Sequence, residues 1–86
     1  MDINHLIAIV KKKLIKECII EVIDIEDKSF LHKNHQGHQE GKFHLKLKIQ
    51  SKELKNLTRI EGNKKIYKVL SKEMSEYIHS LEILIS

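Results

Sequence analysis

The sequence predicts an α+β fold in which a three-stranded mixed sheet carries its helices on one face. Apolar residues recur at helical spacing in the N-terminal stretch and again in the C-terminal half. Between them, residues 43–50 alternate strictly between apolar and polar, which is typical of a half-buried strand. The predicted order is α-β-β-α-α-β. Because proline, repeats and Ser/Gly-rich linkers are absent, we expect a single domain over residues 1–86.

The first helix is predicted over residues 3–16, where apolar residues share one face and lysines gather toward the C-terminal end. Asp2 is a suitable N-cap, because its carboxylate can accept a bond from an unpaired helical N–H. Residues 18–26 are rich in β-branched side chains and too few for a convincing second helix. We therefore expect them to form the first strand.

The middle of the chain combines a polar segment with the clearest strand signal. Residues 27–41 are rich in His, Asn, Gln and Gly and show no periodicity, which predicts a long loop. The strand over residues 43–50 follows, with Phe43, Leu45, Leu47 and Ile49 on its apolar face.

The C-terminal half contains two predicted helices and a last strand. Ser51 begins a short helical turn, and Thr58 with Glu61 forms a capping box that starts a longer helix. We expect this helix to carry apolar residues as far as Ile78. The third strand is predicted from Leu81 onward, where alternation resumes.

Composition and charge exclude several classes of protein. The net charge is +4, and lysine supplies 15 of the 16 basic residues. The single cysteine, Cys18, rules out an internal disulfide and a zinc site built only from cysteines, and we expect it to act as a small buried hydrophobe. No apolar run approaches the roughly 18 residues of a membrane span, and no targeting segment is visible, so we expect a cytoplasmic protein.

No catalytic constellation is visible in the sequence. There is no glycine-rich phosphate loop. The neighbouring acids Glu26 and Asp27 stand at the end of a predicted strand without an apolar pocket that could separate their pKa values. We therefore expect a protein that is not an enzyme.

A histidine-rich segment is the first candidate site. His32, His35 and His38 form a His-x-x-His-x-x-His pattern, and His44 follows, so that four of six histidines fall within thirteen residues. Two of these imidazoles could bind one metal ion. The alternative is a polar loop whose histidines are only solvated.

The basic residues form the second candidate, a surface for nucleic acid or a protein partner. On the central strand it comprises His44, Lys46 and Lys48, and on the helix pair it comprises Arg59, Lys64, Lys65 and Lys68. The alternative is a solvated helix face. The alternative is favoured because glutamates are interspersed and because lysine reads base edges poorly compared with arginine.

The element order and three local motifs resemble the BolA family. The motifs are Glu21-Val22-Ile23-Asp24 with the Asp27-Lys28-Ser29 loop entry and His32 three residues further on; Gly41-Lys42-Phe43-His44-Leu45; and Arg59 through Tyr67, where Arg59, Lys64, Ile66 and Tyr67 fit the family pattern. The resemblance implies a fold like the type II KH domain without its Gly-x-x-Gly loop.

The resemblance also implies a function. It indicates an adaptor that pairs with a monothiol glutaredoxin in iron–sulfur cluster assembly, trafficking or iron regulation. No cofactor is implied for the free protein. In the complex, a [2Fe–2S] cluster would be shared between one glutaredoxin cysteine, glutathione and two BolA ligands, here His32 in the loop and a histidine in the long helix.

The chain departs from the family at that second ligand. Gly62 and Asn63 stand where the resemblance places an Arg-His pair, and the amide of Asn63 is not a strong nitrogen donor. We predict that Asn63→His restores cluster binding and that Gly62→Ala stabilises the helix by about 1 kcal/mol. Two alternatives stay open: a KH-like DNA-binding transcriptional regulator, and an interaction module that has lost cluster chemistry.

Overall fold

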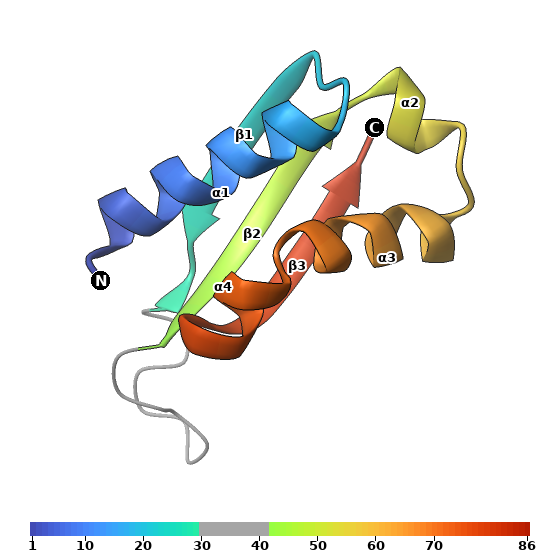
Figure 1. Ribbon diagram of the computed structural model, residues 1–86. Helices are drawn as coiled ribbons and strands as arrows, with labels where there is room; N and C mark the ends of the chain where they lie inside the picture. The colour runs from blue at the N-terminus through green and yellow to red at the C-terminus, as the bar shows by residue number, and fades with distance from the viewer. Residues whose placement is uncertain (30–41) are drawn as a thin grey trace.

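The computed structural model describes residues 1–29 and 42–86, and its elements follow the predicted order with one additional helix break. They are α1 (Ile3–Glu17), β1 (Val22–Asp27), β2 (Phe43–Gln50), α2 (Lys52–Lys55), α3 (Arg59–Val69), α4 (Ser71–Glu76) and β3 (Ile78–Ile85). The strand order is β1-β2-β3, with β1 antiparallel and β3 parallel to β2. The predicted mixed sheet with helices on one face is confirmed (Figure 1).

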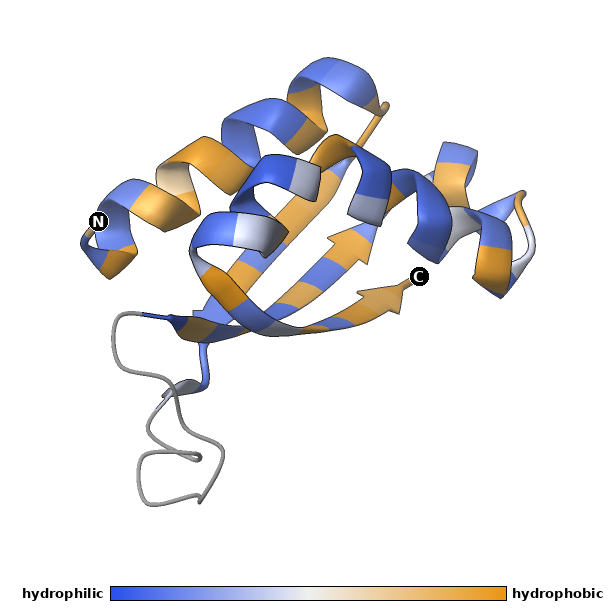
Figure 2. Cartoon of the chain, turned by 60° about the horizontal axis from the view of Figure 1, so that its bottom comes forward, coloured by the Kyte–Doolittle hydropathy of each residue, from blue (hydrophilic) through white to orange (hydrophobic). Residues whose placement is uncertain are grey.

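The core lies between the helices and one face of β2. Figure 2 shows the alternation of hydrophobic and hydrophilic residues along the strands. Leu6, Val10 and Leu14 form the buried stripe of α1, while Asp2 caps its first turn by accepting from the His5 N–H at 2.9 Å. The buried apolar residues are Leu6, Val10, Leu14, Cys18, Leu45, Leu47, Ile49, Leu54, Ile66, Leu70 and Ile78. Within the described residues, no helix is both long and apolar enough to cross a bilayer.

Cys18 behaves as the sequence predicts, although the first strand begins later than expected. The backbone N–H of Cys18 closes α1 by donating to the Leu14 carbonyl, and its thiol is buried. Burial raises the pKa of this thiol and so disfavours the thiolate. β1 starts only at Val22, because the chain that leaves α1 first contacts α2, where the Ile19 N–H donates to the Glu53 carboxylate at 2.6 Å.

The prediction of one long helix reaching Ile78 is wrong at the C-terminal end of that helix. It breaks at Leu70, which leaves helical geometry (φ −98°, ψ 17°) and is fully buried, so that α4 begins at a new angle. β3 then starts at Ile78, three residues before the predicted position. The periodicity failed here because Ile78 pairs with Phe43 in the sheet while His79 and Ser80 interrupt the alternation.

Two predicted caps are confirmed and fix the connection from β2 to α3. Thr58 accepts from the Glu61 N–H and Glu61 accepts from the Thr58 N–H, both at 3.1 Å, which completes the capping box. The buried Ser51 hydroxyl accepts from the Leu54 N–H and donates to the Ile19 carbonyl at 2.6 Å. This corner therefore holds α2 against the chain between α1 and β1.

Gly62 lies where α3 packs against the C-terminal end of β3. A Cβ atom at this position would stand 3.2 Å from the Ile85 Cδ1 atom and 3.6 Å from the Leu54 carbonyl oxygen. The first distance is shorter than an ordinary carbon–carbon contact. Close packing against Ile85 is thus a reason for a glycine at position 62, and helix propensity alone does not provide one.

We expect Gly62→Ala to stabilise the fold by about 0.5 kcal/mol, less than the ~1 kcal/mol gain in helix propensity, because the Ile85 side chain must shift. Ile85→Val removes the Cδ1 atom in question, so the same glycine substitution should gain its full propensity in that background. Thermal unfolding of the unsubstituted protein, the two single variants and the double variant measures how much Gly62→Ala stabilises each background. Equal gains in both backgrounds would show that the Ile85 contact does not constrain position 62.

Candidate functional site

A β-bulge lies at the loop end of the sheet, which is the end formed by Phe43 and Ile78. Phe43 pairs with Ile78, but His44 pairs with Ser80, so His79 is the additional residue. Bulges re-aim side chains and are frequent beside functional sites. Here the two imidazole rings, of His44 and His79, lie with centroids 4.9 Å apart and planes inclined by 59°.

The two histidines differ in exposure. His44 is only 5% exposed, its backbone N–H donates to the Ser29 hydroxyl at 3.0 Å, and its Nδ1 lies 2.6 Å from the Ser80 hydroxyl. His79 is exposed. A fixed, buried imidazole thus lies against one that a partner can reach. The prediction that His44 belongs to an exposed partner surface is wrong, because its ring is buried at the bulge.

The predicted metal ligands His32, His35 and His38 lie outside the described residues. The two residues that flank this segment, Ser29 and Lys42, are both at the loop end of the sheet: Ser29 contacts the His44 backbone, and Lys42 directly precedes β2. The described residues contain no group of three or more His, Cys, Asp or Glu side chains that could hold a metal ion. The pair of His44 and His79 would therefore need ligands from elsewhere.

Asn63, the position of the missing family ligand, lies at the other end of the sheet. It is half-buried and lines a groove together with Leu54, Ile83 and Ile85. Ile85 is seven residues beyond Ile78 along β3, which corresponds to roughly 23 Å of strand. The structure thus separates position 63 from the flanks of the histidine-rich segment.

Sequence reasoning missed His79 as a site residue. Nothing in the local pattern marks it, since its importance depends on the parallel pairing of β3 with β2 and on the bulge between them. The sequence contains one relevant signal, the interruption of the alternating pattern just before Leu81. This signal does not indicate which residue the His79 ring contacts.

The open face of the sheet, which the helices do not cover, has charges of alternating sign. Lys46 is flanked by Glu26 on β1 and Glu82 on β3, and Lys48 is opposite Asp24. Glu26 also forms ion pairs of 2.8 Å with Lys28 and 2.9 Å with Lys48. Such cross-strand pairs leave little positive potential on this face. Lys46 and Lys48 are therefore largely compensated.

Glu26 makes the stability of this face depend on pH. Hydrogen bonds from Lys28 and Lys48 lower the pKa of Glu26 to about 2. A carboxyl group whose pKa is depressed in the folded state stabilises the fold above its unfolded pKa, and this stabilisation is lost as the pH falls from about 5 toward 2. We expect Glu26→Gln to flatten the decrease in melting temperature over that range. A decrease as steep as that of the unsubstituted protein would contradict the role of these pairs.

The predicted helix cations do not form one surface with the strand lysines, because helices and open face lie on opposite sides of the sheet (Figures 1 and 2). A groove of about 570 Å³ lies between α1 and α3, and we call it the lysine groove. It is lined by Lys13, Lys16, Lys65 and Lys68 together with Glu17 and Val69. Lys64 is exposed on α3. Arg59 lines the groove that contains Asn63 instead.

Fold and site define a small α+β domain with a mixed three-stranded sheet, an open charged face and a histidine pair at the loop end. The chain belongs to the BolA family, because the family model described as BolA-like protein matches residues 14–86. This confirms the resemblance that the sequence motifs indicate.

Three relatives illustrate the similarity. The DNA-binding transcriptional regulator BolA of Haemophilus influenzae is 31% identical over 75 residues, which are 87% of this chain and 70% of the relative. The solved BolA domain of SufE1 from Arabidopsis thaliana matches with a TM-score of 0.77 and 26% identity, covering 92% of this chain and 87% of that one. BolA1 from Arabidopsis thaliana matches with a TM-score of 0.75 and 27% identity, covering 91% and 86%.

Proposed function

We propose that this protein is an adaptor for a monothiol glutaredoxin in iron–sulfur cluster assembly, trafficking or iron regulation. The observation that carries the proposal is the contact between His44 and His79 beside the flanks of the histidine-rich segment. The exposed imidazole of His79 is available to a cluster that a second protein presents, while His44 and the bulge fix its position.

The donor chemistry suits a shared [2Fe–2S] cluster. Such clusters are normally held by thiolates, and imidazoles can replace two of them. We propose His32 and His79 as the two ligands from this chain, with His79 in the role that the family resemblance assigns to position 63. Cys18 does not suit this role, because its thiol is buried and burial raises its pKa.

Reconstitution with a monothiol glutaredoxin, glutathione, iron and sulfide tests the proposal. We expect a coloured heterodimer whose visible circular dichroism differs from that of the glutaredoxin loaded alone. His32→Ala should remove that difference, while His5→Ala, a histidine of the exposed first turn of α1, should preserve it. A heterodimer spectrum that is insensitive to His32→Ala would contradict the assignment.

A second candidate function is DNA binding, which the name of the Haemophilus influenzae relative and the lysine groove favour. Two of the four lysines are partly compensated, since Lys13 contacts Glu73 at 2.7 Å and Lys65 contacts Glu53 at 3.2 Å. Lys16 and Lys68 form no ion pair within residues 1–29 and 42–86.

A salt titration separates the two functions. Phosphate contacts make affinity for duplex DNA fall steeply as salt rises, with a slope that counts the neutralised phosphates. If DNA binding is the function, the double substitution Lys16→Gln and Lys68→Gln should reduce that slope by about 2. Binding that disappears at physiological salt leaves the adaptor as the supported function.

A further inference from the structure

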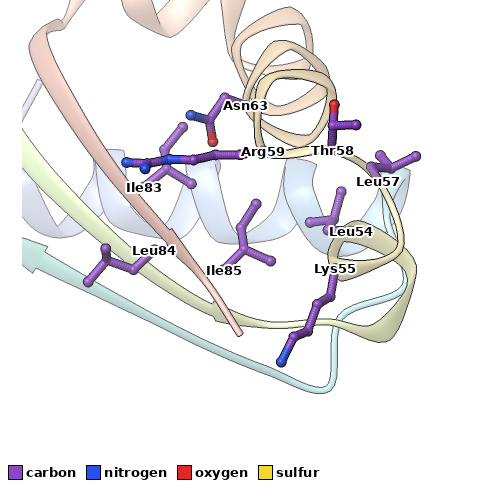
Figure 3. Close-up of a pocket in the computed structure, with 9 residues that line it drawn as sticks. All are labelled: Leu54, Lys55, Leu57, Thr58, Arg59, Asn63, Ile83, Leu84 and Ile85. Atoms are coloured by element: carbon purple, nitrogen blue, oxygen red, sulfur yellow. The ribbon is translucent and has the colours of Figure 1, made fainter.

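A second concave site lies at the end of the sheet opposite His44 and His79. This C-terminal groove has a volume of about 430 Å³ and is lined by Leu54, Lys55, Leu57, Thr58, Arg59, Asn63, Ile83, Leu84 and Ile85 (Figure 3). Its floor is aliphatic, and Figure 3 shows the Arg59 side chain extended from the start of α3 toward β3. Arg59 forms no ion pair with any other described residue.

The groove follows the free edge of β3. The N–H and C=O groups of Ser86 point toward β2, since they bond to Ile49 at 2.8 Å and Ser51 at 3.0 Å. Successive residues of a strand direct these groups to opposite edges, so those of Ile83 and Ile85 face away from β2. Within the described part of the chain, no strand pairs with that edge.

The same edge is already used once as a hydrogen-bonding surface. The Tyr67 hydroxyl of α3 donates to the Leu81 carbonyl at 3.1 Å. Further along, α3 approaches β3 closely at Gly62, and the groove opens beside this contact, where Ile83 and Ile85 supply both backbone groups and apolar side chains. An extended ligand placed here would meet backbone donors, backbone acceptors and a nonpolar floor.

We propose that the C-terminal groove binds an extended peptide segment that carries a carboxylate. The peptide adds to the edge of β3 through the N–H and C=O groups of Ile83 and Ile85, as peptides do in strand addition to an open sheet edge. One of its apolar side chains occupies the floor between Leu54 and Leu57. Its carboxylate pairs with the Arg59 guanidinium, whose donors match carboxylate geometry.

The lining favours a peptide over single-stranded nucleic acid. Proteins that bind single-stranded nucleic acid without sequence preference use grooves that combine cationic side chains with aromatic side chains, on which the bases stack. This groove contains no aromatic residue among its described lining, whereas backbone groups on a free strand edge suit a second polypeptide. The site is independent of the proposed cluster ligands, which belong to the loop end.

Titration with a short peptide of alternating valine and threonine that contains one aspartate tests the inference. We expect the Ile83 and Ile85 amide resonances to shift and their hydrogen exchange to slow, because these amides gain hydrogen bonds. Arg59→Gln should weaken binding about tenfold, and replacing the aspartate of the peptide by asparagine should have the same effect. Lys64→Gln is the matched control, since Lys64 is exposed on α3 and does not line the groove.

Four results would overturn the inference. The first is the absence of binding at millimolar peptide, and the second is binding without slower exchange at Ile83 and Ile85. The third is tighter binding of oligothymidylate to the same groove, which would identify it as a nucleic-acid site. The fourth is a concentration-dependent dimer that protects the β3 edge, which would identify a second copy as the occupant. The heterodimer spectrum with glutaredoxin is a separate readout, so either proposal can fail alone.

Discussion

His79→Ala is expected to lower the yield of cluster-loaded heterodimer with a monothiol glutaredoxin by about tenfold or more, since even indirect support of a metal ligand is typically worth that much. The His79 ring is exposed at the bulge and lies against the buried ring of His44. Removing it takes away a nitrogen donor without opening the core. Visible absorption of the reconstituted mixture, corrected for unfolded protein by circular dichroism, gives the yield.

Asn63→His is the matched control for this experiment. It introduces an imidazole at the position that the family resemblance indicates, but position 63 lines the groove at the opposite end of β3. We therefore now expect it to leave the heterodimer spectrum unchanged in both the unsubstituted and the His79→Ala background. Recovery of the cluster in the double variant would show that position 63 can reach the cluster.

Lys13→Met is expected to destabilise the fold by about 2 kcal/mol. The Glu73 carboxylate on α4 is 4% exposed and contacts the Lys13 ammonium on α1 at 2.7 Å. Its second oxygen has no hydrogen-bond partner among the described residues. Removing one member of a buried pair typically costs ~3–5 kcal/mol, and we expect a loss below that range here because the Lys13 side chain is 39% exposed. Urea unfolding at neutral pH measures the loss.

A double-mutant cycle identifies the cause of that loss. In the Glu73→Gln background no carboxylate remains without its partner, so Lys13→Met should then cost less than about 1 kcal/mol. Lys12→Met is the control, because Lys12 is exposed on the same helix. If Lys13→Met is equally destabilising in both backgrounds, the ammonium acts through its packing and not through the ion pair.

Local patterns predicted those parts of the fold that depend on neighbours in sequence. The alternation over residues 43–50 gave the bounds of β2, and Thr58 with Glu61 gave the start of α3 through a capping box. Both signals depend on hydrogen bonds and periodicity within a few residues. The break at Leu70 could not be predicted in this way, because it depends on burial of that side chain in the assembled core.

The candidate site depends on contacts between distant segments, which explains what the sequence did not show. His44 and His79 are brought together by a parallel pairing and a bulge, neither of which has a local signature. Likewise, the negative charges beside Lys46 belong to Glu26 on β1 and Glu82 on β3. The sequence of β2 by itself therefore suggests a basic face that the assembled sheet does not have. Only the family resemblance indicated the type of partner.

Pulsed electron paramagnetic resonance of the reduced heterodimer, with ¹⁵N-histidine in this chain alone, tests the assignment of His79 most directly. Nitrogens bound to a cluster iron give resolved couplings, so the spectrum reports how many imidazoles of this chain are ligands. We expect two couplings in the unsubstituted protein and loss of one in the His79→Ala variant. Two unchanged couplings in that variant would contradict the assignment of His79 as a cluster ligand.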